Sequence, residues 1–149
     1  MKLLTVTGPS VDDKTISYQT EGAACFDIMS TEDGIVESGS FKVFKTGLIA
    51  GVIEDGYEIK GDVLPELQIR SRSGLAAKHG LFVLNAPGVI DIDYFGNEIK
   101  VILANAGPVD YAIKAGDRIA QGAFSFVVRP SNINVKQVER TSGLGSTGK

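Results

Sequence analysis

Residues 98–128 read EIKVILANAGPVDYAIKAGDRIAQGAFSFVV, and this stretch decides the fold class. Two apolar runs within it, Glu98–Ala104 and Ile119–Val128, have the character of strands. The turn signals Gly107-Pro108 and Ala115-Gly116-Asp117 stand between them. A parallel α/β sheet would need a helical segment there, and the pattern offers none of sufficient length. The stretch therefore favours an all-β fold.

The rest of the chain repeats this pattern of short apolar runs separated by turn residues. Its 18 glycines and 5 prolines punctuate the sequence, and many short strands at such spacing are typical of a sandwich or barrel. Only Ser73–His79 is expected to be helical, with the Ser73 side chain as its cap. The other expected strands are Leu3–Thr7, Ala24–Met29, Phe41–Lys45, Leu48–Ile53, Tyr57–Lys60, Leu67–Arg70, Leu81–Leu84 and one near Asn134–Val138.

Length and composition indicate a soluble protein of one domain. The 149 residues suit a single domain, and 43% hydrophobic with 22% charged residues are ordinary globular values. The net charge of −3 argues against a general affinity for nucleic acid. A single cysteine, Cys25, fits a reducing compartment. No apolar run reaches the roughly 18 residues of a membrane span, and Met1–Thr7 lacks the layout of a signal peptide, so we expect a cytoplasmic protein without membrane contact.

The segment Arg70–Ala76, RSRSGLA, is rich in groups that bind phosphate. Its arginines offer guanidinium donors, its serines offer hydroxyls, and Gly74 permits close approach of the backbone. The same residues would also suit a solvated turn. Alone, the segment leaves a phosphate site and an ordinary turn open.

A second segment, residues 85–96, places a carboxylate inside an apolar run. In NAPGVIDIDYFG an extended backbone would project Asp91 and Asp93 to one face, and Ile90 and Ile92 to the other. A carboxylate in such surroundings can become basic enough to activate water. The alternative is a half-exposed strand whose acidic residues face solvent.

Several other chemistries find no support in the sequence. GLGSTGK at residues 143–149 matches part of a P-loop, but neither a Ser or Thr nor a helix follows Lys149 in this sequence. His79 is the only histidine, which excludes a Ser-His-Asp triad and a three-histidine zinc site, and no CxxC pair is present. A metal, if one is used, should be a hard cation such as Mg²⁺ held mainly by substrate phosphates. Asp117 and Arg118 are candidates for an ion pair within a turn.

Five segments, in order along the chain, resemble the motifs of the trimeric dUTP diphosphatase (dUTPase) family. Any one of them would be weak evidence, whereas all of them in the right order are specific. They run from residue 23 to the end of the sequence. They are Ala23–Ile28, Arg72–Ala76, Asn85–Gly96, the complete GDRIAQ of Gly116–Gln121, and Arg140 with Gly143–Gly148.

The resemblance implies a distorted, jelly-roll-like β barrel (β-clip) that forms a homotrimer with shared active sites. It implies a barrel domain over residues 1–139 and a flexible C-terminal arm over residues 140–149. It also implies Mg²⁺-dependent hydrolysis of dUTP to dUMP and pyrophosphate by attack of water on the α-phosphorus. This reaction would limit uracil in DNA and supply dUMP for dTMP synthesis. The expected location is the bacterial cytoplasm, or the host cytoplasm for a phage protein.

The same resemblance assigns roles to the motif residues that handle the phosphates. Asp91 would orient and deprotonate the attacking water, and Asp27 would bind the water shell of Mg²⁺. Ser73 would lie near the bond that breaks. The residues expected to bind or contact the phosphates are Arg72, Ser73, Gly74 and Gln121.

The nucleoside and the arm complete the implied site. Asn85, with backbone groups of the hairpin that includes Gly88 and Ile90, would read the uracil edge. Tyr94 would pack on the deoxyribose, where a 2′-hydroxyl would clash. Composition alone also suits a frayed tail, but the resemblance favours an arm that closes over the γ-phosphate and excludes water. The arm residues expected to bind substrate are Arg140, Leu144, Gly145, Ser146 and Thr147.

Three departures from the family pattern have consequences. Ser71 stands where proline is usual, so we expect a looser turn before Arg72. Leu144 stands where an aromatic ring normally stacks on uracil, in a motif one residue shorter, so weaker closure of the arm is expected. Tyr57–Leu67 is longer than the usual connection and is expected to be a surface loop, a candidate contact for a further partner.

Three alternatives remain to be separated from dUTP hydrolysis. A dCTP deaminase shares the fold but needs a glutamate where Val101 stands, and Val101 cannot move protons. A noncatalytic binding module on the same barrel would not need Asp91 and Arg72 together. A structural jelly roll without a ligand would leave the phosphate-type residues unexplained. The products formed from dUTP and dCTP discriminate between these readings.

Overall fold

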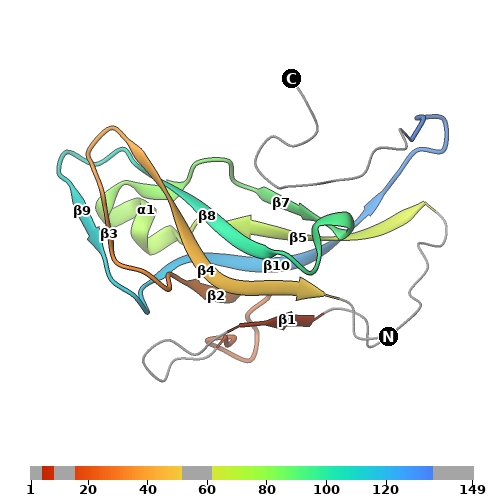
Figure 1. Ribbon diagram of the computed structural model, residues 1–149, viewed down its shortest axis with the longest axis horizontal. Helices are drawn as coiled ribbons and strands as arrows, with labels where there is room; N and C mark the ends of the chain where they lie inside the picture. Colours follow the sequence, from red (N-terminus) through yellow and green to blue (C-terminus); the bar gives the residue numbers. More distant parts are fainter. Residues whose placement is uncertain (1–4, 9–15, 52–61, 136–149) are drawn as a thin grey trace.

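The computed structural model describes residues 5–8, 16–51 and 62–135, which form strands, one short helix and one 3-10 turn (Figure 1). The all-β prediction is therefore confirmed. None of the helical segments in these residues is long and apolar enough to cross a membrane. In chain order the elements are β1 (Thr5–Thr7), β2 (Phe26–Met29), β3 (Gly34–Val36), β4 (Phe41–Gly51), β5 (Val63–Arg70), α1 (Ser73–His79), β6 (Leu81–Val83), β7 (Gly88–Asp91), η1 (Ile92–Tyr94), β8 (Glu98–Asn105), β9 (Tyr111–Ile113) and β10 (Arg118–Val128).

The strands form antiparallel sheets around one core. Two four-stranded sheets have the orders β1-β4-β8-β6 and β2-β10-β5-β7, and β3 pairs with β9. Side chains alternate in burial along β4, β5 and β8, which is the period expected when one face of a strand packs inward. Both large sheets contribute to the same cluster of buried side chains, which includes Phe26, Ile28, Phe44, Leu67, Ile69, Val101, Leu103 and Ile119.

Most of the expected strands are present, with different boundaries. Phe41–Lys45 and the first four residues of the expected strand Leu48–Ile53 belong to one strand, β4, which passes through an irregularity between Lys45 and Ile49. Val52 and Ile53 lie outside the described residues. Gly47 provides the positive φ of 64° that this irregularity requires. The sequence pattern missed β3, β7 and β9, which have only three or four residues each. Tyr57–Lys60 lies outside the described residues, as does most of the strand expected near the end.

The expected surface loop at Tyr57–Leu67 is wrong for its second half. Val63–Leu67 forms the first part of β5 and pairs with β10 from Leu67↔Phe124 to Val63↔Val128. Pro65 is tolerated there because β7, the other neighbour of β5, starts to pair only at Glu66. The part of the loop before residue 62 lies outside the described residues.

The helix has the predicted bounds, but its N-cap residue differs from the prediction. α1 spans Ser73–His79, and the residue at its N-cap position is Arg72, without a side-chain cap hydrogen bond. Ser73 is therefore the first helical residue and not the cap, which corrects the sequence prediction. The helix ends at Gly80, whose φ of 70° is the left-handed conformation that glycine adopts freely.

Candidate active site

Three predicted phosphate-site residues meet where β2, β10 and the end of β5 adjoin. Asp27 on β2 stands opposite Gln121 on β10, so the two side chains lie on the same face. Gln121 is also opposite Arg70, the last residue of β5. Arg72 follows directly and reaches back to Asp27, with 3.2 Å between Nε and Oδ1. Strand pairing thus collects these groups from distant parts of the sequence.

The Asp27 carboxylate is held between two arginines. Its side chain is only 11% exposed, and Oδ2 lies 3.0 Å from Nη1 of Arg118 on the side opposite the Arg72 contact. Burying a charge is costly unless it is paired, and here each oxygen has a guanidinium partner. Asp27 therefore holds Arg72 in place.

Arg72 itself is fixed from two directions. Besides the Asp27 contact, its Nη1 donates a hydrogen bond of 2.8 Å to the backbone carbonyl of Arg118. These contacts use two of the five N–H donors of a guanidinium, and the side chain remains 26% exposed. It also lines a pocket of about 270 Å³ with Arg118 and Leu75. Arg72 can therefore receive a phosphate oxygen while it stays anchored.

The turn before Arg72 is tied to two strands. The side-chain amide of Gln121 donates to the Ser71 carbonyl at 3.0 Å, and the Ser71 hydroxyl accepts the backbone N–H of Val83 at 2.9 Å. The expectation that Ser71 loosens this turn is therefore wrong. Its hydroxyl connects the turn to β6, a hydrogen bond that a proline could not make.

Ser73 and Gly74 are exposed at the start of α1. A Cβ on Gly74 would meet no atom of the described chain within 4 Å. Packing among the described residues does not demand glycine at this position. The backbone beside Arg72 is therefore open to a ligand, as a close phosphate contact would need.

The turn that leads into Arg118 is closed by its own residues. Asp117 accepts the backbone N–H of Lys114 at 2.8 Å, and Gly116 has a φ of 88°. The sequence candidate for an Asp117–Arg118 ion pair is wrong, because Arg118 pairs with Asp27 instead. The sequence prediction of the site does not include Arg118, because its partner Asp27 lies 91 residues away along the chain.

Asp33 stabilises the same turn through contacts with Ala115 and Lys114. Its carboxylate accepts the backbone N–H of Ala115 at 2.9 Å and pairs with the Lys114 ammonium at 3.0 Å. The Ala115 hydrogen bond, followed by the Lys114 contact, lowers the pKa of Asp33 below its ordinary value.

The predicted uracil hairpin joins β6 to β7. A Cβ on buried Gly88 would lie 3.2 Å from Nδ2 of Asn85, which is closer than most Cβ contacts in proteins. It would lie 3.4 Å from Cβ of Ile69, which is an ordinary contact. Glycine therefore lets the Asn85 amide fold against the start of β7. Further along β7, Ile90 stands opposite Leu67 and packs against the core.

Asp91 is the last residue of β7, opposite Glu66 on β5, and is exposed in the single chain. The extended run ends there because Ile92–Tyr94 form the 3-10 turn η1. The prediction that Asp91 and Asp93 share one face of a strand is therefore wrong: only Asp91 is on the strand. Asp91 follows directly on the hairpin, with its side chain exposed among the described residues.

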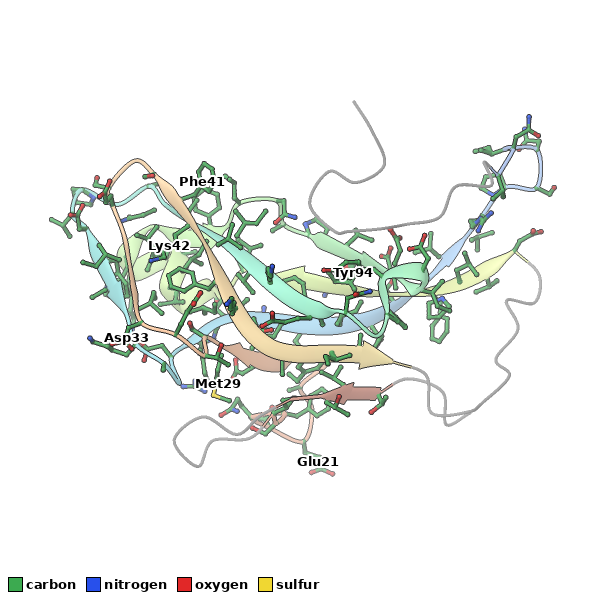
Figure 2. The ribbon with its side chains drawn as sticks, viewed as in Figure 1. Glu21, Met29, Asp33, Phe41, Lys42 and Tyr94 are labelled. Carbon is green, nitrogen blue, oxygen red and sulfur yellow. The ribbon has the colours of Figure 1, made fainter. Side chains whose placement is uncertain are left out.

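Tyr94 is held at the other end of η1. Its hydroxyl donates to the Glu98 carbonyl at 3.2 Å, and its ring is half-buried. Figure 2 shows Tyr94 in the turn that follows β7, well separated along the long axis from Met29 and Asp33.

The predicted site residues of one chain form two groups. We call Asp27, Arg72, Ser73, Gly74 and Gln121 the Arg72 cluster, and Asn85, Gly88, Ile90, Asp91 and Tyr94 the Asp91 hairpin. Arg72 directly precedes α1, whereas Asp91 is the last residue of β7 and stands opposite Glu66 in the middle of β5; Figure 1 shows α1, β5 and β7. Asp91 is level with Glu66, four residues before β5 ends at Arg70, so about 13 Å of strand separates Asp91 from the turn that carries Arg72.

The remaining predicted site residues lie outside the described part of the chain. These are the residues of the arm, namely Arg140, Leu144, Gly145, Ser146 and Thr147.

The glutamate that deamination would require is absent from its expected place. Val101 is 1% exposed and stands opposite Phe44 within the core. The nearby Glu98 accepts the backbone N–H of Gly47 at 3.1 Å and so serves the irregularity in β4. Neither residue offers a proton-transfer group at the position that the deaminase alternative needs.

The sequence is similar to known proteins over most of its length. The sequence model of the dUTPase family matches residues 12–148. The deoxyuridine 5'-triphosphate nucleotidohydrolase of Nautilia profundicola is 48% identical over 137 residues, or 89% of this chain and 89% of that protein. The protein of the same name from Wolinella succinogenes is 46% identical over 137 residues, or 89% and 85% of the two chains.

Solved structures share the fold at lower identity. The dUTPase of Staphylococcus bacteriophage 80alpha is 22% identical, with a TM-score of 0.69 and coverage of 98% of both chains. The dUTPase of EIAV is also 22% identical, with a TM-score of 0.64 and coverage of 93% of this chain and 99% of that one. The predicted jelly-roll-like fold is thereby confirmed. With the family model matching almost the whole sequence, the chain belongs to the dUTPase family.

Proposed function

We propose that this protein hydrolyses dUTP to dUMP and pyrophosphate in a Mg²⁺-dependent reaction. The Arg72 cluster is the observation that carries the proposal: an anchored, partly exposed guanidinium stands beside an open serine and an open glycine. Such a set suits the oxygens of a polyphosphate. Membership of the dUTPase family supplies the substrate, and curated relatives carry the name deoxyuridine 5'-triphosphate nucleotidohydrolase.

In the proposed reaction, water attacks the α-phosphorus of dUTP. The new bond joins the water oxygen to that phosphorus, and the bond from the α-phosphorus to the bridging oxygen of the β-phosphate breaks. Pyrophosphate leaves with the bonding electrons, and Asp91 accepts the proton of the water. Arg72, Ser73, Gly74 and Gln121 orient the phosphates and stabilise the charge that moves onto the leaving oxygen.

Magnesium fits this site as a hydrated ion carried by the substrate. Among the described residues no group of three or more His, Cys, Asp or Glu side chains is close enough to form a metal cage. Both oxygens of Asp27 already face arginines, yet a carboxylate oxygen can accept a second hydrogen bond. Asp27 can therefore hold a water of the ion while phosphates ligate it directly, which is common for Mg²⁺. When bound, the ion would neutralise negative charge on the triphosphate.

We further propose that the enzyme is a homotrimer with sites shared between copies. The Asp91 carboxylate must reach the same phosphorus that the Arg72 cluster orients. Within one chain about 13 Å of strand, followed by the turn at Ser71, separates them, more than the Asp91 side chain spans. Asp91 of one copy would therefore serve the Arg72 cluster of another, and the contact would also desolvate Asp91.

The other parts of the proposed site select and enclose the nucleotide. The Asn85 amide and the hairpin backbone would read the uracil edge, and the Tyr94 ring would exclude a 2′-hydroxyl. Residues 140–149 would act as an arm that closes over the triphosphate of a barrel formed by residues 1–139. In the cytoplasm this activity would limit uracil in DNA and provide dUMP for dTMP synthesis, without direct contact with nucleic acid or membrane.

The test is a product analysis with three nucleotides. Purified protein is incubated with Mg²⁺ and dUTP, dCTP or dTTP, and the products are separated by chromatography. We expect dUMP and pyrophosphate from dUTP alone, loss of turnover on chelation of Mg²⁺, and a decrease of about 10²–10⁴-fold in kcat for Asp91→Asn. Asp93→Asn is the matched control and should retain activity. A uracil product from dCTP, or no turnover by the wild type, would contradict the proposal.

A further inference from the structure

The pairing of β10 with β2 contains an irregularity that changes the direction of Arg118. From Gly122↔Phe26 through Gln121↔Asp27 to Ala120↔Ile28 the register is regular. Continued without change, it would place Arg118 opposite Ser30. Instead Arg118 stands opposite Met29, which means that β10 holds one extra residue, Ile119.

This β-bulge decides which face Arg118 occupies. Side chains alternate along a strand, so residues opposite Asp27 and Met29 lie on one face, and a residue opposite Ser30 would lie on the other. The extra residue thus brings Arg118 to the face that carries Asp27 and Gln121.

On that face Arg118 is connected to Arg72 in two ways, once through Asp27 and once directly. Its Nη1 lies 3.0 Å from Oδ2 of Asp27, whose other oxygen pairs with Nε of Arg72. Its backbone carbonyl accepts the second hydrogen bond of Arg72, at 2.8 Å. Gln19 accepts another hydrogen bond of 3.0 Å from the same Nη1, which fixes the Arg118 guanidinium in turn.

The balance of charge around Asp27 explains why both Arg72 and Arg118 are needed. Asp27 is almost buried, while the Arg118 side chain is 43% exposed and the Arg72 side chain is 26% exposed. With both present, one carboxylate is shared, and the cluster keeps a net positive charge for an anion. Without Arg118, Asp27 would pair with Arg72 alone, and that pair would be neutral.

From this geometry we infer that Arg118 is a positioning residue for the phosphate-binding arginine. It does not itself need to touch the substrate. It holds Asp27 so that Arg72 has a fixed direction, and it keeps the carboxylate from neutralising Arg72 completely. This inference rests on the proposed function, because it assumes that Arg72 binds the triphosphate.

The experiment compares Arg118→Gln, Arg118→Lys, Asp27→Asn and the double variant Arg118→Gln/Asp27→Asn with the wild type. Arg129→Gln, at an exposed arginine just after β10, is the matched control for the loss of one positive charge. Each protein is assayed for dUTP hydrolysis, for binding of the non-hydrolysable analogue dUpNHpp, and for inhibition by deoxyuridine, which has no phosphate. Circular dichroism records the melting temperature of each.

We expect Arg118→Gln to lower kcat/KM by about 10- to 100-fold, because small displacements of an orienting group have effects of that size. Binding of dUpNHpp should weaken, while inhibition by deoxyuridine stays within about twofold of the wild type. Arg118→Lys should recover most of the loss, since an ammonium can also pair with Asp27. In the Asp27→Asn background, Arg118→Gln should add less than about threefold, since the route through Asp27 is already lost.

Three results would overturn the inference. One is equal weakening of dUpNHpp and deoxyuridine with a lower melting temperature, which indicates general structural damage. Another is full additivity of Arg118→Gln and Asp27→Asn, which indicates that Arg118 does not act through Asp27. The third is an Arg118→Gln enzyme that behaves like Arg129→Gln. A wild type that does not hydrolyse dUTP refutes the proposed function instead, so the two failures are distinguishable.

Discussion

Asn105, the last residue of β8, allows a quantitative test of how the fold is held together near the site. It is 2% exposed, and its amide nitrogen donates to the carbonyls of Val36 at 2.9 Å and Val109 at 2.8 Å. Its side-chain oxygen accepts the backbone N–H of Gly107 at 2.8 Å. One side chain thus joins β3, β8 and the turn before β9. The next residue, Ala106, donates to the carbonyl of Gly80 at the end of α1.

Replacing Asn105 with Ala removes all three of these hydrogen bonds. Each contributes about 0.5–1.5 kcal/mol net, and water can reach only some of the groups left behind, so we expect a loss of about 3 kcal/mol in the free energy of unfolding. For a chain of this length that corresponds to a decrease of about 6–12 °C in melting temperature. Asn105→Asp should be at least as damaging, because it sets a carboxylate oxygen against two carbonyls.

The assay is urea and thermal unfolding followed by circular dichroism, with all variants at one protein concentration because oligomers unfold in a concentration-dependent way. Asn132→Ala, at an exposed position, is the control and should change stability by no more than about 0.5 kcal/mol. If Asn105→Ala lost less than about 1 kcal/mol, the reasoning that this amide joins the three segments would be refuted.

Three further predictions concern the turns around the site. Ser71→Ala should cost about 1–2 kcal/mol by leaving a backbone N–H of β6 unpaired, measured by urea unfolding, and an unchanged midpoint would show that the turn does not depend on this hydroxyl. Gly88→Ala should displace the Asn85 amide and raise KM for dUTP more than it lowers kcat, in steady-state kinetics; an unchanged KM would count against that contact. The carboxyl carbon of Asp33, followed by NMR, should titrate below the ordinary value of 3.8, so its stabilising effect is present above that pH and is lost as the pH falls through the lowered pKa. Asp33→Asn should therefore lower the melting temperature at neutral pH and have a smaller effect in acid, and equal effects at both would contradict this assignment.

The sequence predicts the regular parts of this fold well. The apolar run at Glu98–Ala104 becomes β8 almost unchanged, and Ser73–His79 is the helix. Strands such as β3 and β9, with three residues each, exist because the rest of the fold holds their partners together. Three residues are too few for a period to be visible.

The candidate site also has parts that the sequence predicts and parts that only the fold determines. The residue types around Arg72 already suggest phosphate chemistry, whereas Gln121 enters the predicted site only through the family resemblance. The partnership of Arg118 with Asp27 depends on strand register and on one extra residue in β10, and no local pattern encodes either. The same holds for Ser71, whose hydroxyl finds its donor on another strand.

In the proposed reaction, dUTP is hydrolysed at sites to which one copy supplies Asp91 and another supplies Arg72. The most direct measurement mixes two inactive variants, Asp91→Asn and Arg72→Ala, after unfolding and refolding them together in equal amounts. Random assortment would give a functional pair at about a quarter of the sites, so we expect about a quarter of wild-type dUTP hydrolysis, with dUMP and pyrophosphate as products. Each variant refolded alone should stay inactive. A mixture as inactive as its components would contradict the shared site, because no intact combination of the two residues would then have formed between copies.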